Sequence, residues 1–434
     1  MRTRRRRRCG ASSRQAHRGG QRYHHGLGGT TAKASLIENG ETTFSPEYEV
    51  GGGFSQSNRL ARGGGYLLRT PTLDIAEIGA GGGSIVWIDK GGALQVGPKS
   101  AGANPGPACY GLGGMEPTLT DSCLLLGYLA PEGIAGGSVK LDTSAAERAL
   151  SERVATPLGL DVKALAYGVV QIATSNMTRA IRSVSTERGK NPRDFSLFAF
   201  GGNGGLFAAS VARELELPQV VIPPSSGIFS AFGLLYSDLE HHFTQTLLGR
   251  TDELDPESVE TYWKRLEVEA RDLLASEGFS GERCRLRRRG ELRYYGQTHE
   301  LSVPWPESGS AGENLSRASA DFEDEHERTY GHRGGDGLVE LVNLHLVATG
   351  VPETPRFPES LQFPEILKTK TGERQAYFGA EMGWQAAKLI NRSMLDESMK
   401  KGPFILQEFD ATILVPPDFA IARDEFDNIL MRLE

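Results

Sequence analysis

Three glycine-rich segments hold the residues of this chain that are best suited to chemistry. They are Gly79-Ala80-Gly81-Gly82-Gly83-Ser84, Gly28-Gly29-Thr30-Thr31 and Phe200-Gly201-Gly202-Asn203-Gly204-Gly205. Glycine leaves backbone amides uncovered, so such a loop wraps an anion or lets a ligand reach the main chain. Three of these loops in one chain predict a phosphate or nucleotide site. For any one loop alone, a tight turn is the alternative interpretation.

Regular elements adjoin each loop and would position it. The loop at residues 79–84 runs into an apolar strand at residues 85–88, and the loop at residues 28–31 precedes a strand that ends at the turn pair Asn39-Gly40. Both segments have the pattern of a hairpin opened by a glycine loop. The third loop ends a strand at 197–200 and opens a helix at 206–214. Such a helix N-terminus is the usual position of a bound nucleotide.

The pattern of the remaining residues indicates an α/β protein with a domain boundary near residue 240. An apolar stripe with a three-and-four spacing predicts a long helix from the N-cap Asp161 to about Arg188, and a β-α-β pattern follows, which favours a parallel sheet covered by helices. We expect a core domain at residues 26–238 and a C-terminal α+β domain at residues 239–434, rich in strands from about residue 365. The expected later elements are a helix at 253–277 and strands at 286–304 and 339–349.

Composition narrows the class of protein. The chain has 434 residues, of which 38% are hydrophobic and 24% charged, as in a globular protein of two or three domains. No apolar run is long enough to span a membrane and no signal peptide is visible, so we expect a cytoplasmic protein without a membrane partner. The cysteines show no CxxC pair, which excludes a zinc finger or a secreted disulfide framework. They are Cys9, Cys109, Cys123 and Cys284.

Residues 1–25 differ sharply from the rest of the chain. They include nine arginines and no acid, whereas the whole chain has a net charge of −7, so the remaining residues are strongly acidic. An acidic body is a poor nucleic-acid binder, and we expect no nucleic-acid partner. A basic arm, a nuclear signal and a transit peptide are alternatives for the arginine-rich segment. No Leu, Ile, Val or Phe precedes Leu27, so we expect a disordered tail that is not part of the fold.

Several motifs together resemble the hydantoinase A and 5-oxoprolinase family, and the similarity runs from about Leu27 to the C-terminus. The longest is Gly97-Pro98-Lys99-Ser100-Ala101-Gly102-Ala103-Asn104-Pro105-Gly106-Pro107-Ala108-Cys109-Tyr110-Gly111. The others lie at residues 74–85, 117–121, 177–182, 198–202, 294–297 and 330–332.

The resemblance implies a fold and an activity. It implies the second half of an ASKHA fold, the actin-like and ribonuclease-H-like ATPase architecture, followed by an α+β and β-rich C-terminal domain. The activity would be that of a subunit or fragment of an ATP-dependent hydrolase that opens 5-oxoproline or hydantoin rings after phosphorylation of the amide oxygen. It also implies a hetero-oligomer with a hydantoinase B-like subunit. A subunit of an acetone- or acetophenone-type carboxylase, or an inactive assembly subunit, are the alternatives.

The same resemblance assigns roles to individual residues. The ATP-binding positions would be Gly28, Gly29, Thr30, Thr31, Gly201, Gly202 and Gly204. The substrate-binding positions would be Gly81, Gly82, Gly83 and Ser84. A divalent metal, Mg²⁺ or Mn²⁺, would be held near Asp74, Cys109 and Asp121. Carboxylate oxygens suit such ions, although a helix cap or loop hydrogen bond is the alternative for each acid, and a buried thiol for Cys109.

The sequence departs from the family pattern at several positions. The pattern has a first phosphate hairpin of the form Asp-x-Gly-Gly-Thr, which residues 1–25 do not supply, so we expect a separate N-terminal half as a further partner. The acid expected before the second hairpin is Gly26, and the histidine expected after Asp74 is Ala76. Gly205 and Phe207 stand where the pattern has Pro and His. We therefore expect weak or no ATP hydrolysis by the chain alone, and no catalytic residue is assigned.

Overall fold

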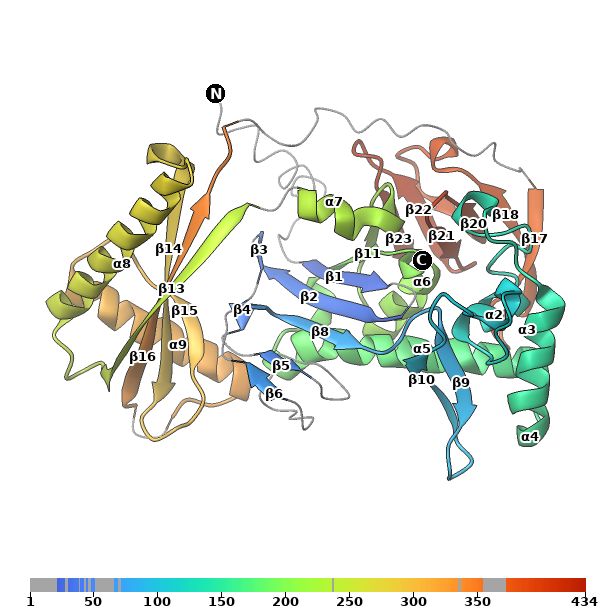
Figure 1. The fold of residues 1–434 in the computed structure, drawn as a ribbon, viewed down its shortest axis with the longest axis horizontal. Coiled ribbons are helices and arrows are strands. Elements are labelled where there is room, and N and C mark those ends of the chain that lie inside the picture. The colour runs from blue at the N-terminus through green and yellow to red at the C-terminus, as the bar shows by residue number, and fades with distance from the viewer. Residues whose placement is uncertain are drawn as a thin grey trace. The chain divides into compact units, whose positions relative to one another are not determined.

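The computed structural model describes residues 22–27, 30–38, 40–42, 44–45, 48–50, 66–68, 72–235, 238–334, 337–353 and 372–434. The chain divides into two compact units (Figure 1). Unit 1 comprises Met1–Thr186, Asn191–Phe232 and Gln362–Glu434, and unit 2 comprises Glu187–Lys190 and Gly233–Leu361. The predictions for Gly28, Gly29 and residues 1–21 lie outside the described residues.

A nine-stranded sheet forms the centre of unit 1. Its order is β19-β22-β23-β12-β11-β1-β2-β3, and β8 also pairs with β2. Strands β1, β11 and β12 are parallel to one another, and the other pairs are antiparallel. The bounds are β1 Arg22–Leu27, β2 Ala32–Glu38, β3 Glu41–Thr42, β8 Ile75–Ile78, β11 Ser196–Phe200, β12 Val220–Ile222, β19 Lys400–Lys401, β22 Phe419–Arg423 and β23 Ile429–Leu433.

Strand β1 begins before the boundary that we expected at residue 25. Its backbone pairs with strands on both sides, so that Tyr23 lies opposite Leu36 of β2 and Leu197 of β11. Residues 22–25 are therefore part of the sheet. The expectation relied on the absence of aliphatic residues before Leu27, but main-chain hydrogen bonding to two neighbours does not require them.

Helices α5 and α6 cover one face of this sheet. Helix α5 packs against β2 and β8, α6 packs against β11 and β12, and the two helices contact each other (Figure 1). Asp161 is the N-cap of α5, as predicted, and accepts hydrogen bonds from the amides of Lys163 and Ala164. The α-helices of unit 1 are α2 Leu119–Leu125, α3 Thr143–Leu150, α4 Thr156–Leu158, α5 Val162–Val184 and α6 Gly204–Leu215, with a π-helix at Ser151–Ala155. Helix α7, Phe229–Leu235, begins in unit 1 and ends in unit 2.

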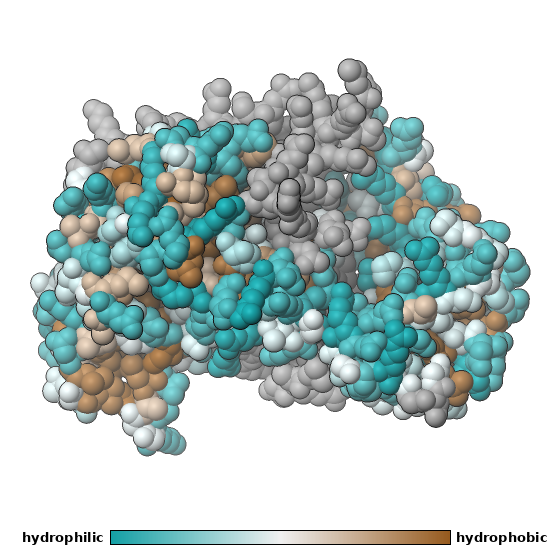
Figure 2. Space-filling model, turned by 180° about the vertical axis from the view of Figure 1, so that it is seen from behind, coloured by the Kyte–Doolittle hydropathy of each residue, from teal (hydrophilic) through white to brown (hydrophobic). Residues whose placement is uncertain are grey.

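Four short strands and a hairpin complete the N-terminal part of unit 1. Strands β4 Phe44–Ser45 and β7 Thr72–Leu73 pair, as do β5 Tyr48–Val50 and β6 Tyr66–Leu68. Strands β9 Ser84–Ile88 and β10 Leu94–Ser100 form the hairpin that follows the first glycine loop. Hydrophobic residues gather on the surface near this hairpin (Figure 2). Leu94 is half-buried there, and 42% of Trp87 is exposed.

The C-terminal strands belong to unit 1, whereas we expected them in one domain with residues 239–371. Strands β17 Gly372–Tyr377, β18 Trp384–Ile390, β20 Phe404–Gln407 and β21 Thr412–Val415 form a four-stranded sheet. Strand β23 joins the central sheet, where Leu430 lies opposite Val221 of β12. The β-rich end piece is confirmed, but its partner is distant in sequence, and local patterns do not reveal such pairings.

Unit 2 is a four-stranded antiparallel sheet with two helices. Its strand order is β13-β16-β14-β15, and α8 and α9 pack on the sheet around the fully buried side chains of Trp263 and Phe322. The bounds are β13 Leu239–Arg250, α8 Pro256–Ser276, β14 Cys284–Tyr294, β15 Leu301–Pro304, α9 Ala311–Tyr330 and β16 Val339–Gly350. Sequence analysis missed α9, although Ser310 and Glu313 form a capping box at its start. No helix within the described ranges is long and apolar enough to cross a membrane.

Candidate functional site

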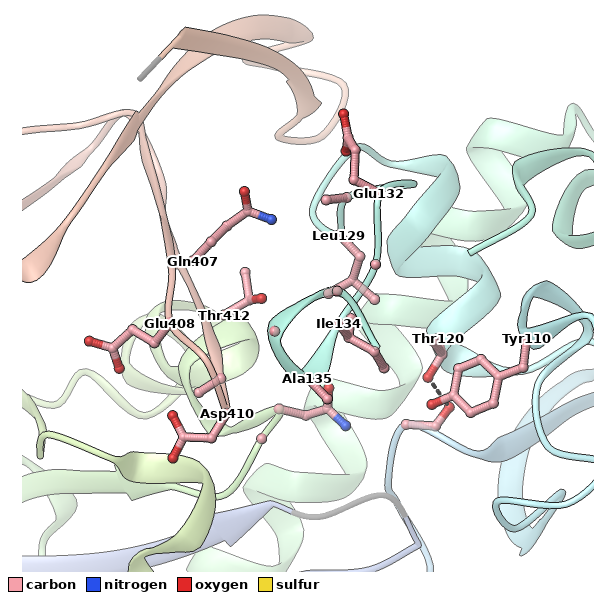
Figure 3. A pocket seen from close by; sticks show the side chains of 18 of the residues that line it. Tyr110, Thr120, Leu129, Glu132, Ile134, Ala135, Gln407, Glu408, Asp410 and Thr412 are labelled. Atoms are coloured by element: carbon pink, nitrogen blue, oxygen red, sulfur yellow. Dashed lines mark hydrogen bonds between the residues drawn. The ribbon is translucent and has the colours of Figure 1, made fainter. Parts of the chain in front are cut away.

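A cavity of about 540 Å³ lies in unit 1 (Figure 3). Its volume is within the range of small-molecule sites. The lining comes from the three glycine loops, from the segments before and after α2, and from the C-terminal sheet. The lining residues are Thr30, residues 82–83, 102–103, 129–130, 132–137, 202–203, 407–408 and 410–412, with Tyr110, Thr120, Arg374 and Leu389.

The loop at residues 79–84 is rigid because its own side chain and backbone hold it. The Gly81 amide donates to Ser84 Oγ at 2.8 Å, and the Ser84 amide donates to the Gly81 carbonyl at 2.9 Å. Ser84 is fully buried, so it serves the loop and does not face a ligand. Within the described part of the chain, the amides of Gly82 and Gly83 have no hydrogen-bond acceptor. These two residues line the cavity and leave two donors available there.

Gly82 brings the first and third glycine loops together. A Cβ atom at this residue would lie 2.6 Å from Asn203 Nδ2 and 2.8 Å from Thr120 Oγ1, so a larger residue would have to displace these two side chains. Thr120 also binds the Gly82 carbonyl, through its amide at 2.9 Å and its hydroxyl at 2.8 Å. From the sequence we assigned residues 81–84 to a substrate-binding site that is separate from the ATP-binding positions. The structure instead places Gly82, Gly83, Gly202 and Asn203 around one cavity.

The third glycine loop, at residues 200–205, is the one that the family resemblance places on the adenosine side of ATP, and we call it the adenosine-side loop. It joins β11 to α6, as its sequence pattern predicts. Gly201 has a φ of +87°, a conformation that favours glycine, and its amide donates to the Ser226 carbonyl at 2.7 Å. Gly204 begins α6, and the N-cap residue Asn203 makes no side-chain cap. The first turn of a twelve-residue helix thus opens beside the cavity, with the partial positive charge of a helix N-terminus.

Only half of the predicted phosphate hairpin can be located. Thr30 is exposed and lines the cavity, and Thr31 is half-buried. Gly28 and Gly29 lie outside the described residues. Thr30 therefore lines the same cavity as residues of the other two loops.

The predicted metal residues do not form a metal site in the described part of the chain. Asp121 is fully buried and accepts four hydrogen bonds: from the amides of Ala108, Cys109 and Thr118 at 2.7–3.3 Å and from the Thr118 hydroxyl at 2.7 Å. It forms the capping box of α2 with Thr118, and none of its bonds involves Asp74. Burial, reinforced by Asp121, raises the pKa of the Cys109 thiol strongly, which keeps the sulfur neutral. The described residues contain no cluster of three or more His, Cys, Asp or Glu suited to a metal.

The opposite wall of the cavity was not predicted at all. It comes from the β20–β21 turn and from β17, where Gln407 accepts a hydrogen bond from Arg374 Nη2 at 3.2 Å. Arg374 Nη1 and Asp410 Oδ2 are shielded from solvent and have no hydrogen-bond partner among the described residues. The Asp410 carbonyl lies so close to Gly227 that a Cβ there would be only 2.2 Å away. The sequence signal for this wall is weak, because isolated polar residues in short strands are common.

Two family models match the chain, and both describe one family. The hydantoinase/oxoprolinase model matches residues 25–243, and the model of the hydantoinase/oxoprolinase C-terminal domain matches residues 251–433. The chain belongs to the hydantoinase/oxoprolinase family. The α/β fold expected from the resemblance is also confirmed, since solved structures of the family superimpose on most of the chain.

Individual relatives include enzymes with different substrates. The chain is 39% identical over 92% of its length to an uncharacterized protein of Methanocaldococcus jannaschii and 34% identical over 92% to the caprolactamase subunit alpha of Pseudomonas jessenii. It covers 57% and 56% of those two proteins. The chain is also 32% identical over 81% of its length to the acetophenone carboxylase gamma subunit of Aromatoleum aromaticum, of which it covers 50%.

The structural neighbours agree with these relatives. The crystal structure of the ATP-dependent caprolactamase from Pseudomonas jessenii matches with a TM-score of 0.82 and 32% identity, over 98% of this chain and 60% of that one. The nucleotide-free acetone carboxylase structure matches with a TM-score of 0.69 at 24% identity, over 95% of this chain and 58% of that one, and indicates a shared fold. The chain thus spans little more than half the length of these relatives.

Two departures from the hydantoinase/oxoprolinase pattern have structural counterparts. Ala76 is buried in β8 and lies opposite Ala34 of β2 in the core of the sheet. At Gly205, a Cβ atom would lie 2.7 Å from Ile413 Cγ1 and 2.8 Å from the Thr412 carbonyl. Strand β21 therefore packs directly on the first turn of α6. This contact holds the cavity wall formed by β17 and the β20–β21 turn against the adenosine-side loop.

Proposed function

We propose that this chain is the nucleotide-binding part of an ATP-dependent cyclic amide hydrolase. One observation carries the proposal: Thr30, Gly82, Gly83 and Gly202, from three separate glycine-rich segments, line a single cavity at a helix N-terminus. The similarity to an ATP-dependent caprolactamase supports both the nucleotide and the class of substrate.

The glycine side of the cavity suits the phosphate groups. The amides of Gly82 and Gly83 are available donors, the Thr30 hydroxyl is exposed, and α6 adds its N-terminal dipole. No lysine is among the described lining residues, and Arg374 is the lining arginine, on the C-terminal wall. Amides and the helix therefore provide the positive potential at this side. The described residues contain no cluster of three or more His, Cys, Asp or Glu suited to a metal, and none of the following steps relies on a divalent ion.

The proposed reaction uses ATP to create a leaving group. An unstrained cyclic amide resists water because its carbonyl carbon is a poor electrophile and its nitrogen leaves poorly. The amide oxygen attacks the γ-phosphorus of ATP and ADP departs, which gives an O-phosphorylated imidate. Water then adds to the carbon and the C–N bond breaks, which gives an open-chain amine with an acyl phosphate. A second water hydrolyses the acyl phosphate and releases phosphate and the amino acid. One ATP and two waters are consumed for each ring opened.

We further propose that a second subunit completes the enzyme. Three of the relatives that match this chain are named as subunits, one of caprolactamase and two of ketone carboxylases. The chain covers only about half of each, so the first phosphate hairpin would come from the remaining sequence of such proteins, on the same or another polypeptide. A hydantoinase B-like subunit is the expected partner. Weak or absent ATP hydrolysis by this chain alone follows from the incomplete phosphate site.

The test is phosphate release in the presence of candidate rings. Purified chain would be assayed with ATP and caprolactam, 5-oxoproline or hydantoin, with and without a co-expressed hydantoinase B-like subunit. We expect ring-dependent phosphate release only with the partner. If no ring stimulates phosphate release and a ketone with bicarbonate does, the chain serves a carboxylase, which its similarity to acetophenone carboxylase favours as the second candidate. A stable complex that consumes no ATP under any condition identifies an assembly subunit.

A further inference from the structure

The cavity has two chemically different ends. Glycines, threonines and the start of α6 surround one end. The other end is formed by the loop at residues 129–137 and by the C-terminal sheet, and its lining includes the apolar residues Leu129, Ile134 and Leu389. Figure 3 shows Leu129 and Ile134 on that loop. A nucleotide has the same polarity, with phosphates at one end and a flat apolar base at the other. The phosphate assignment therefore leaves the second end for the base.

Gln407 stands at this second end with a fixed orientation. Its Oε1 accepts the hydrogen bond from Arg374 Nη2, and this bond identifies which side-chain atom is the oxygen. The Nε2 group has no acceptor among the described residues and can donate to a ligand. Figure 3 shows the Gln407 side chain directed toward the loop that carries Leu129 and Glu132. Burial lowers the pKa of Arg374, with Glu132 opposing this effect, but an arginine remains charged in proteins. The charged Arg374 side chain thus fixes the orientation of the Gln407 amide through this hydrogen bond.

Arg374 also has an unused group in the same place. Its Nη1 atom is shielded from solvent and has no acceptor in the described part of the chain. A buried donor without a partner costs roughly 1–3 kcal/mol, and a ligand that supplies an acceptor recovers that cost. This end of the cavity therefore offers two donors, from Gln407 and Arg374, beside apolar walls.

We propose that Gln407, positioned by Arg374, reads the base of the bound nucleotide and selects adenine over guanine. This inference rests on the proposed function, since it requires a nucleotide in the cavity. A glutamine amide can donate to N7 of adenine while its oxygen accepts from the N6 amino group. The Gln407 oxygen keeps a second lone pair for N6 after its bond to Arg374. Guanine has a carbonyl oxygen at that position, which would face the Gln407 oxygen without a proton between them.

The experiment measures base preference separately from phosphate binding. Dissociation constants for ATP, GTP and inorganic tripolyphosphate would be measured calorimetrically for the whole chain and for Gln407→Ala. We expect the unmodified chain to prefer ATP over GTP by about tenfold or more, and Gln407→Ala to lose most of this preference through weaker ATP binding. Tripolyphosphate affinity should not change. Gln385→Ala is the matched control, because Gln385 lies on neighbouring β18 and bonds only to the Met382 carbonyl.

A second variant tests the positioning role of Arg374. Arg374→Met should reduce the ratio of ATP affinity to GTP affinity, because the Gln407 amide is then able to rotate. The melting temperature should not change. Equal ATP and GTP affinities in the unmodified chain, or an unchanged ratio in Gln407→Ala, would overturn the inference while leaving the nucleotide site intact. If the folded chain binds neither ATP nor tripolyphosphate, the proposed function itself fails and the inference with it.

Discussion

The buried charged side chains of unit 2 and those at the cavity of unit 1 differ in their pairing. In unit 2, Arg288 is almost fully buried and bonds to both Glu260 and Glu267 at 2.7–3.0 Å, while Arg293 bonds to Glu340 at 2.6 Å. In unit 1, the cavity contains Arg374 and Asp410, each with a buried atom that has no partner among the described residues.

This difference favours unit 1 as the unit that binds a ligand. Buried charges that satisfy each other hold a fold in one arrangement and leave nothing for a ligand to complete. Donors and acceptors without partners carry a cost that a bound molecule can offset. We therefore assign nucleotide binding to unit 1 and expect changes to the paired charges of unit 2 to affect stability alone.

The largest expected effect is on the stability of unit 2. Arg288→Met would leave Glu260 and Glu267 as neighbouring carboxylates without their shared cation, and we expect the free energy of unfolding to fall by about 3 kcal/mol. Guanidinium titration followed by the fluorescence of Trp263 and Trp305 measures it, in a background with Trp87 and Trp384 changed to Phe. ATP affinity should stay the same.

Arg333→Met is the control for this prediction. Arg333 also contacts three acids, but its side chain is 50% exposed, so its loss should lower the free energy of unfolding far less than the loss of Arg288. Equal losses for both variants, or a fall in ATP affinity with Arg288→Met, would contradict the distinction between the two units.

The second prediction concerns Asp121, which is saturated by hydrogen bonds and so belongs to the fold of unit 1 and not to a metal site. Asp121→Asn would turn an amide group toward donors that now face a carboxylate oxygen, and we expect a loss of about 2–3 kcal/mol in the free energy of unfolding. Thermal melts with and without Mg²⁺ or Mn²⁺ provide the measurement. A melting temperature that rises with metal in the unmodified chain but not in Asp121→Asn would restore Asp121 as a ligand.

The third prediction separates binding from stability within unit 1. Gly82→Val would push Asn203 and Thr120 into the cavity, and we expect roughly hundredfold weaker ATP binding, about 2.7 kcal/mol. Gly168→Ala is the control, because its Cβ would meet only Leu94 Cδ2 at 3.9 Å, within α5. That variant should bind ATP normally and be slightly more stable. Similar ATP affinities for both variants would show that the glycine loop at residues 79–84 does not contribute to the ATP site.

The smallest expected effect is the response of unit 2 to acid. His242 Nδ1 and His345 Nε2 share a hydrogen bond of 3.0 Å, and burial, together with His242, Arg289 and Arg287, lowers the pKa of His345 to about 4. The unfolded chain binds this proton near pH 6.5, before the folded one does, so stability is complete above about pH 6.5 and declines as the pH falls toward 4.

We expect a loss of about 2 kcal/mol in the free energy of unfolding of unit 2 between pH 7 and pH 4. Unfolding followed by the fluorescence of Trp263 and Trp305 at several pH values measures it. His345→Gln should flatten this part of the profile. An unchanged slope in that variant would show that other groups control the acid response, and that the histidine pair is not part of the internal pairing of unit 2.

The sequence predicted those parts of unit 1 whose signals are local. Asp161 as a helix N-cap and the glycine run before β9 depend on neighbouring residues, and both are present as expected. The third glycine loop also opens a helix, α6. Such features are visible because caps and tight loops need particular residue types at fixed positions.

What escaped prediction depends on contacts between distant residues. The pairing of β23 with β12 joins residues about 200 positions apart. The packing of β21 on α6 is equally distant in sequence, and it places Gln407 and Asp410 at the cavity. Asp121 was assigned to a metal because the sequence shows a carboxylate but not the four donors that surround it. For the same reason, the glycine run was separated from the adenosine-side loop that it touches.

Photolabelling with 8-azido-ATP tests the central claim most directly, because it reports where the base of a bound nucleotide lies. The folded chain would be irradiated with the reagent, digested, and its labelled peptides identified by mass spectrometry, with excess ATP as competitor. We predict ATP-protected labels in residues 129–137 or 404–412 of unit 1. Protected labels confined to unit 2, or no protected label under conditions in which ATP binds, would contradict the assignment of the cavity as the nucleotide site.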